Sequence, residues 1–473
     1  MRSCEGKRKL RVMRHALFAV ALVFGGGGCA SSTAANDHGD ASTRDGNGLP
    51  ILGGHGGWTG PCTGLECQIH ACNAAPTDIS GTIYDPAGRN PLYGVVAYIP
   101  NATPEPFTQG ASCGTCDSLF TGTPIATAIS DAYGKFTLTN VPDGVDVPIV
   151  VQVGKWRKQT LIPHVTRCAS NALPDKSLRL PRNHTEGDIP MIAISTGGSD
   201  TLECLLSRVG VDASEYSPGA TGPGHIQIYL GDSLGVVPNT SPPGPMSAVA
   251  LWDSTADLMR YDLLLLSCEG QETVSMNQPA LLAYTAAGGR VFASHFHYAW
   301  FNTGPFALGD LATWTPGIND IGNIVADVQG QLPDRSAFPK GAAMQNWLGN
   351  VGALRDGQLP IEEAKHNANV TSLNPLSTPW LLAGLTSKAP HAAQYFSFDT
   401  PLGAAAAAVC GRVVYSDLHV GAASNDNPKL PVPQDCTPGA LSPQEAALEF
   451  MLFDLSSCVI PLSQPPGPPQ PTK

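Results

Sequence analysis

The sequence predicts an exported, multidomain protein in which a small β-sandwich precedes an α/β domain with a mainly parallel sheet. Two patterns predict this fold class. Between residues 77 and 182, short alternating segments are separated by turn residues, which is typical of a sandwich. From residue 188 onward, continuous apolar runs alternate with amphipathic stretches, which is typical of buried parallel strands and the helices that cover them.

The first 29 residues have the composition of an export signal. A basic segment with six Lys and Arg residues precedes the apolar run ALFAVALVF at 16–24, which is too short to span a bilayer. The next residues, GGGGCASS, resemble the lipobox of bacterial lipoproteins. This resemblance implies lipidation of Cys29 and, because Ala30 follows it, an outer-membrane location, periplasmic or at the cell surface. Gly26 departs from the Leu that lipoboxes prefer, so plain secretion is the alternative.

The chain that remains after this leader is strongly acidic. It keeps 21 Lys and Arg residues against 38 Asp and Glu residues, a formal charge of −17. Such a surface repels nucleic acid and anionic lipid heads. No second long apolar run follows, so we expect membrane attachment through the lipid alone. The partner that we expect is a glycan or peptide of the cell envelope or the extracellular space.

Eleven cysteines follow Cys29, and in an oxidising compartment most of them should pair, with one left over. Zinc binding is the alternative for CTGLECQIHAC at 62–72 and CGTC at 113–116, but only one pair of cysteines has the ligand spacing. Disulfides are therefore favoured, with Cys436 to Cys458 as a local guess. The disulfide candidates are Cys62, Cys67, Cys72, Cys113, Cys116, Cys168, Cys436 and Cys458.

Residues 30–76 are small, polar and glycine-rich, and predict a flexible tether that carries a cysteine cluster. Strands are predicted at 79–85, 92–100 and 147–156 and on both sides of the DAYG turn at 131–134. SGTIYDPAGRNPLYGVVAYIPN and AISDAYGKFTLTNVPDG resemble the carboxypeptidase regulatory-like, or transthyretin-like, domain, with Asp85, Gly88, Asp131 and Gly134 at the turns. The insert at 103–122 is unusual for that family and predicts a disulfide-stapled loop.

The α/β domain is predicted over residues 188–459. Its strands are IPMIAIS at 189–195, HIQIYLG at 225–231, DLLLLSCEG at 262–270, RVFASH at 290–295 and CGRVVYSDLHV at 410–420. Helices are predicted at 196–210, 246–261, 278–289 and 441–458, the last with a capping box of Ser442 and Glu445. Residues 302–392 are weakly periodic and predict an insertion over one edge or the top of the sheet. Residues 460–473 form a Pro-rich tail.

Three segments of this domain resemble the class I glutamine amidotransferase-like superfamily, and especially its ThuA-like branch. They are YDLLLLSCEG at 261–270, GGRVFASHFH at 288–297 and GRVVYSDLHVG at 411–421. The resemblance implies a flavodoxin-like, mainly parallel sheet. It also places His295 where amidotransferases have their nucleophilic cysteine, so thiol hydrolase activity is not expected. Cys268 is the alternative nucleophile, but disulfide pairing or simple burial is the favoured interpretation.

Polar residues follow several of these strands, at the edge where open α/β sheets bind ligands. The ligand-binding candidates at this edge are Glu269, His295, His297, Tyr298, Trp300, Asp417 and His419. A carbohydrate could stack on Tyr298, Trp300, Phe301 or Trp314 while the acidic residues and His419 bind its hydroxyls. The alternative is that these aromatic residues anchor the 302–392 insertion.

A divalent metal such as Zn²⁺ is the possible cofactor. His295 and His297 are two residues apart, as are Asp417 and His419, so on extended segments each pair points to one side. The alternative is that these histidines bind no metal and only form hydrogen bonds with carbonyl groups. The sequence thus predicts a binding or surface-interaction role with a carbohydrate or peptide ligand, and no catalytic residue is assigned. The competing hypothesis is a metal- or His/Asp-dependent enzyme acting on a glycan-type substrate.

Overall fold

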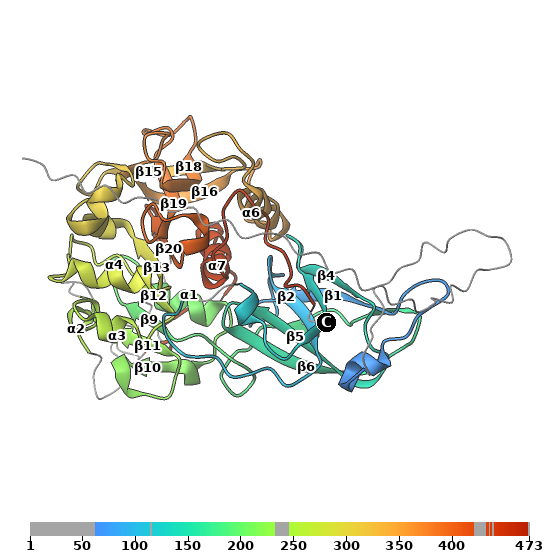
Figure 1. The fold of residues 1–473 in the computed structure, drawn as a ribbon. Coiled ribbons are helices and arrows are strands. Elements are labelled where there is room, and N and C mark those ends of the chain that lie inside the picture. The colour runs from blue at the N-terminus through green and yellow to red at the C-terminus, as the bar shows by residue number, and fades with distance from the viewer. Residues whose placement is uncertain are drawn as a thin grey trace, which may run out of the picture. The chain divides into compact units, whose positions relative to one another are not determined.

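The computed structural model describes residues 62–471, except 114–115, 232–245, 421–431, 435 and 438. The predicted leader, the lipidation site Cys29 and residues 30–61 of the predicted tether lie outside this range, whereas the cysteine cluster at 62–72 lies within it. The described residues contain two four-stranded sheets, a ten-stranded mixed sheet and a two-stranded ribbon, so the molecule is rich in sheet (Figure 1).

The first part of the described chain forms the two four-stranded sheets. One has β4, β1 and β7 in this order with β8 paired to β1, and the other has the order β3-β2-β5-β6. Side chains from both sheets, such as Ile79 and Ile149, belong to one apolar core, which also includes residues of the large sheet such as Ile192. The strands are β1 (Asp78–Tyr84), β2 (Val96–Pro100), β3 (Pro124–Ile129), β4 (Lys135–Thr139), β5 (Gly144–Val153), β6 (Trp156–Val165), β7 (Ser170–Ala172) and β8 (Leu178–Arg179).

The turn between β3 and β4 shows how local chemistry determines where these strands end. Asp131 Oδ1 accepts hydrogen bonds from the backbone N–H groups of Tyr133, at 2.8 Å, and Lys135, at 2.9 Å. Gly134 has a φ of +70°, which residues with a Cβ adopt rarely. The predicted turn therefore forms where an acidic side chain and a glycine coincide.

The large sheet has the order β10-β11-β9-β12-β13-β20-β19-β18-β15-β16. Its first six strands are parallel to their neighbours, and the pairs from β20 to β16 are antiparallel. The parallel strands are β9 (Ile192–Ser195), β10 (Tyr216–Pro218), β11 (Ile226–Tyr229), β12 (Leu263–Leu266), β13 (Arg290–Ser294) and β20 (Gly411–Ser416). β9, β12 and β20 are buried along their whole length, which explains their continuous apolar sequences.

The predicted insertion at 302–392 does more than cover an edge of the sheet, because it adds strands to that sheet. It supplies β15 (Asp320–Val328), β16 (Leu359–Lys365) and β18 (Ser377–Ala383), which reach β20 through β19 (Ala393–Thr400). The strand pairing shifts register within β15–β16 and again within β18–β19. Such irregularities interrupt the alternation of inward and outward side chains, so the sequence showed no clear period. The same segment holds the ribbon of β14 (Thr313–Trp314) and β17 (Ala368–Asn369).

Helices cover the sheet. They are α1 (Leu202–Arg208), α2 (Ala248–Trp252), α3 (Thr255–Leu258), α4 (Gln278–Ala286), α5 (Tyr298–Phe301), α6 (Pro339–Asn350) and α7 (Pro443–Ser456). The predicted helix at 246–261 is two short helices, because Ser254 caps the start of α3. The predicted capping box of α7 is present, and α7 packs against β13 and β20 (Figure 1). Short 3-10 helices occupy Gly64–Gln68, Asp117–Leu119, Ala213–Glu215, Gly219–Thr221, His295–His297, Gly304–Gly309 and Ala406–Ala408.

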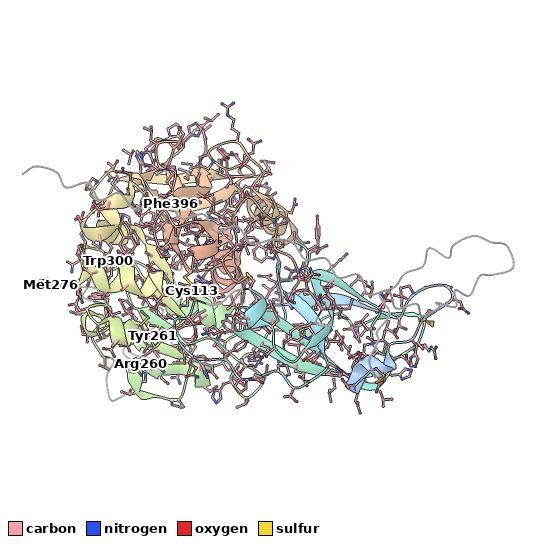
Figure 2. All side chains as sticks on the ribbon, viewed as in Figure 1. Cys113, Arg260, Tyr261, Met276, Trp300 and Phe396 are labelled. Carbon is pink, nitrogen blue, oxygen red and sulfur yellow. A yellow bond between two sulfur atoms is a disulfide. The ribbon has the colours of Figure 1, made fainter. Side chains whose placement is uncertain are left out.

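The described residues contain five disulfides, and all except Cys62–Cys67 join distant parts of the chain. They are Cys62–Cys67, Cys72–Cys168, Cys113–Cys410, Cys116–Cys458 and Cys204–Cys436. All eight candidates are paired, but the guess that Cys436 pairs with Cys458 is wrong, and Cys204 and Cys410 were not among the candidates. Cys113, labelled in Figure 2, belongs to the 103–122 insert, which two disulfides fasten to the late part of the chain. This extent of pairing favours a compartment outside the cytoplasm.

The Pro-rich tail lies against the four-stranded sheet that contains β2 and β3. Pro466 and Pro469 share a cavity with Val96 and Phe120, and Thr127 Oγ1 donates a 2.8 Å hydrogen bond to the Pro469 carbonyl. Within the described residues, no helix combines the length and the apolar character that crossing a bilayer requires.

Candidate functional site

Three neighbouring parallel strands bring Cys268, His295 and His419 together. Cys268 follows β12, His295 follows β13 and His419 follows β20, and these strands are adjacent in the sheet. Cys268 Sγ lies 3.4 Å from His295 Nδ1, and His419 Nε2 lies 3.2 Å from the same atom. Each of the three residues offers one atom that can bind a metal, and these three atoms lie within 4.8 Å of one another, so the residues could hold a metal ion. We call this group the Cys/His cluster.

The backbone turns sharply at His295. Its φ is +39°, a region that residues with a Cβ seldom adopt, and it begins the 3-10 helix His295–His297 directly after β13. Three residues complete one turn of such a helix, so residues two apart do not share a face. The prediction that His295 and His297 point the same way is therefore wrong. His297 Nδ1 instead lies 3.0 Å from the Ser294 carbonyl.

Asp417 does not belong to the Cys/His cluster. Its Oδ2 accepts hydrogen bonds from the backbone N–H groups of Asn367 and, at 3.2 Å, Ala368, and its Oδ1 accepts one from the Tyr415 hydroxyl at 3.0 Å. β20 ends at Ser416, so the segment from Asp417 to His419 is not the extended one that the prediction of a shared side required. Asp417 thus fastens the 302–392 segment to the end of β20.

Burial sets the protonation of the Cys/His cluster. It lowers the pKa of His295 to about 3, with His419 and Lys365 acting in the same direction, and it lowers the pKa of His419 to about 4. It also raises the pKa of the Cys268 thiol to about 12. At neutral pH the cluster therefore consists of two neutral imidazoles and a protonated thiol, which is a poor nucleophile.

The aromatic residues after His297 are part of the protein core. Tyr298, Trp300 and Phe301 are at most 1% exposed. The Trp300 indole, labelled in Figure 2, donates to the Thr273 carbonyl, and the Tyr298 ring stacks on Trp314 with their centroids 6.1 Å apart. The proposed stacking of a sugar on Tyr298 or Trp300 is therefore wrong, because neither ring has a free face. The contact of Tyr298 with Trp314 anchors the 302–392 segment.

Glu269 is buried on the side of β9, where its Oε1 accepts a 3.5 Å hydrogen bond from Ser195 Oγ. Of the seven ligand-binding candidates, His295 and His419 alone meet in the Cys/His cluster. Cys268 completes it, although the sequence favoured a disulfide or simple burial for this residue. Among the described cysteines it is the unpaired one.

A surface pocket of about 470 Å³ reaches His419 from outside. Its lining comes from β16, from the start of α7 and from neighbouring segments: Arg208, Arg355, Pro360, Glu362, Glu363, His419, Ser442, Pro443, Gln444 and Glu445. Four of these ten residues lie in the irregular 302–392 segment, and His419 is the one that was predicted as a ligand-binding residue. Ser442 and Glu445 were recognised as the start of a helix, but no sequence pattern placed that helix start beside His419.

A second group with metal-ligand chemistry consists of His184, Glu215 and His225. Both carboxylate oxygens of Glu215 are already engaged, because each accepts from one imidazole, at 2.6 and 2.8 Å, and from the backbone N–H of the same histidine. Burial would raise the pKa of Glu215, but these hydrogen bonds hold it at about 2. This group therefore has a structural explanation that needs no ion.

Comparison with known proteins identifies no family. No family model matches the chain, and no curated protein matches it significantly. Cytoplasmic Protein STM3548 from Salmonella typhimurium is similar over 57% of this chain and 99% of its own, at 10% identity and a TM-score of 0.28. Two chains of cohesin–X-dockerin complexes from Acetivibrio cellulolyticus are similar over 31% and 29% of this chain and 78% and 85% of their own, at 14% and 15% identity and TM-scores of 0.15 and 0.16. Similarities this weak indicate neither a fold nor a function for this chain.

Proposed function

We propose that the protein is an exported cell-envelope lipoprotein, anchored at Cys29, that binds a peptide or carbohydrate ligand in the pocket beside His419 and has no thiol hydrolase activity. The observation that carries the ligand-binding role is the pocket itself, which opens beside β16, after the end of β20 and at the start of α7. Open sheets of this kind commonly bind ligands beyond the carboxyl ends of their strands. The buried, protonated Cys268 thiol supports a role without thiol catalysis.

The fold proposal rests on the two sheet systems. Six parallel strands with helices between them support a flavodoxin-like, ThuA-like domain. The two four-stranded sheets, with turns at Asp131 and Gly134, support a carboxypeptidase regulatory-like domain before it. The five disulfides support export.

The charges of the lining favour a peptide with a cationic group over a neutral glycan. Glu362 and Glu363 are exposed on the pocket wall, as is Arg355, whereas Arg208 and Glu445 form an ion pair with each other. No aromatic side chain is among the described lining residues, so a sugar would lack the stacking surface that such sites commonly provide. Within the described part of the chain these two carboxylates and the Arg355 guanidinium have no ion-pair partner, so they suit an ammonium group and a neighbouring carboxylate.

Isothermal titration with trilysine, and with maltotriose as a neutral glycan, tests this proposal. Glu363→Gln should weaken trilysine binding about fivefold, because an exposed charge contact contributes on the order of 1 kcal/mol. Asp146→Asn is a matched control, since Asp146 is also an exposed carboxylate at positive φ but lies on β5 of the sandwich. Equal binding by the wild type and both variants, or saturable binding of maltotriose alone, would contradict the peptide proposal.

A further inference from the structure

The Cys/His cluster has the dimensions of a metal centre. Zinc bonds of about 2.0–2.1 Å to nitrogen and about 2.3 Å to sulfur place tetrahedral ligand atoms about 3.3–3.6 Å apart. The His295 Nδ1 to His419 Nε2 distance of 3.2 Å and the Cys268 Sγ to His295 Nδ1 distance of 3.4 Å are close to these values. The third distance in the cluster does not exceed 4.8 Å, so small side-chain rotations would complete the geometry.

We propose that Cys268, His295 and His419 bind Zn²⁺, or a metal ion of similar donor preference, with an open coordination position that the pocket beside His419 can reach. One sulfur and two imidazole nitrogens suit zinc-like ions and exclude Mg²⁺ and Ca²⁺, which prefer oxygen ligands. Three protein ligands leave the fourth tetrahedral position to water or to a ligand. This site differs from the set His295, His297, Asp417 and His419 that the sequence suggested.

The surroundings of the cluster fit a preformed site. The three ligands follow three adjacent strands of one sheet, so the hydrogen-bonded ladders fix their spacing. His295 Nε2 makes no hydrogen bond of ordinary length with the described residues, although the Ile318 carbonyl and the Asn367 side chain are near enough to affect the ring. A proton on Nε2 would leave the Nδ1 lone pair facing the cluster.

The charge balance of binding is simple. Zn²⁺ replaces the proton on Cys268 Sγ, which is released to solvent, and the thiolate so formed carries one negative charge. The Lys365 ammonium acts on both histidines, and its positive charge opposes the binding of a cation. The thiolate offsets this repulsion. The inference concerns the metal alone and does not depend on which ligand the pocket binds.

Cobalt titration tests the inference, because Co²⁺ replaces zinc in such sites and its spectrum reports a bound thiolate. The full mature chain, with its disulfides intact, is stripped of metal with a chelator and titrated with Co²⁺. We expect one Co²⁺ per chain, with a thiolate-to-cobalt charge-transfer band, tetrahedral d–d bands and displacement of both by Zn²⁺. A wild type without the charge-transfer band would overturn the inference.

Three variants separate this site from other thiols and histidines. Cys268→Ser should lose the charge-transfer band, and His419→Gln, at the edge of the cluster, should weaken Co²⁺ binding at least tenfold. His184→Gln, in the second histidine group, should leave the spectrum unchanged. Circular dichroism checks that each variant is folded, and His419→Gln keeps the test valid if Cys268→Ser does not fold. A band that persists unchanged in Cys268→Ser, or full affinity in His419→Gln, would refute the assignment. Trilysine binding by Cys268→Ser separates this outcome from a failure of the peptide proposal.

Discussion

Asp200 lies at the centre of the sheet edge and makes the stability of the protein depend on pH. Its Oδ2 accepts a 2.6 Å hydrogen bond from Oγ of Ser294, the last residue of β13, and its Oδ1 accepts one of 2.9 Å from the Val420 backbone N–H after β20. The side chain is 1% exposed. Burial raises the pKa of Asp200 from 3.8 to about 7, against the effect of the hydrogen bonds from Ser294 and Val420.

The sign of the effect follows from this raised pKa. Between pH 3.8 and about 7 the folded protein holds the Asp200 proton while the unfolded chain has lost it. The free energy of unfolding therefore falls by about 1.4 kcal/mol for each pH unit in this range, a total of about 4 kcal/mol. Asp200→Asn keeps an acceptor for Val420 and places an N–H₂ group at Ser294, but it does not titrate. We expect the variant to lack this loss of stability and to exceed the wild type by about 4 kcal/mol at pH 7.5.

Guanidinium denaturation of both proteins at half-unit intervals from pH 4 to pH 8, without reductant, measures this difference. All other titrating groups are shared, so the difference between the two curves isolates Asp200. Asp200→Ala is the control for the hydrogen bonds, because it also removes the titration but leaves Ser294 Oγ and the Val420 N–H without their acceptor. We expect it to be less stable than Asp200→Asn by about 2–4 kcal/mol at every pH. Parallel curves for the wild type and Asp200→Asn would refute the reasoning.

Three further changes test the packing of the fold by the same denaturation assay. Replacing both Cys113 and Cys410 with alanine opens a link between residues 297 positions apart and should lower the free energy of unfolding by about 2–5 kcal/mol; an unchanged midpoint would contradict a structural role. Ser442→Ala removes the capping box of α7 and should cost about 1 kcal/mol, whereas Ser442→Asp should restore most of it. Trp347→Ala should cost about 3–5 kcal/mol, because the side chain is 1% exposed and its Nε1 donates to the Pro91 carbonyl; a loss below 1 kcal/mol would argue against this packing.

Five of the six parallel strands, all except β10, could be predicted because they are short, apolar and bounded by turns. β9, β12 and β20 are buried at every position, so their sequences are almost continuously apolar and can be recognised as buried strands. β15, β16 and β18 could not be found in the same way, since register shifts disturb their alternation and Glu363 adopts a positive φ within β16. The disulfides between residues 232 to 342 positions apart depend on the tertiary fold, which no local spacing encodes.

The candidate site was predicted in part. His295 and His419 could be named because each follows a recognisable strand. Cys268 was set aside because an exported thiol is usually paired. The pairing of Cys204 with Cys436, which leaves Cys268 as the unpaired cysteine of the described chain, cannot be recognised from the sequence. The His295/His297 pairing failed because a 3-10 turn begins immediately at the strand end.

X-ray absorption at the zinc edge of the zinc-loaded protein tests the central claim most directly, because it measures the bonds of the metal to its ligands. We predict one sulfur atom at about 2.3 Å from the zinc ion and two imidazole nitrogens at about 2.0–2.1 Å, with the sulfur shell lost in Cys268→Ser. A spectrum of the wild type with oxygen and nitrogen neighbours but no sulfur would contradict it.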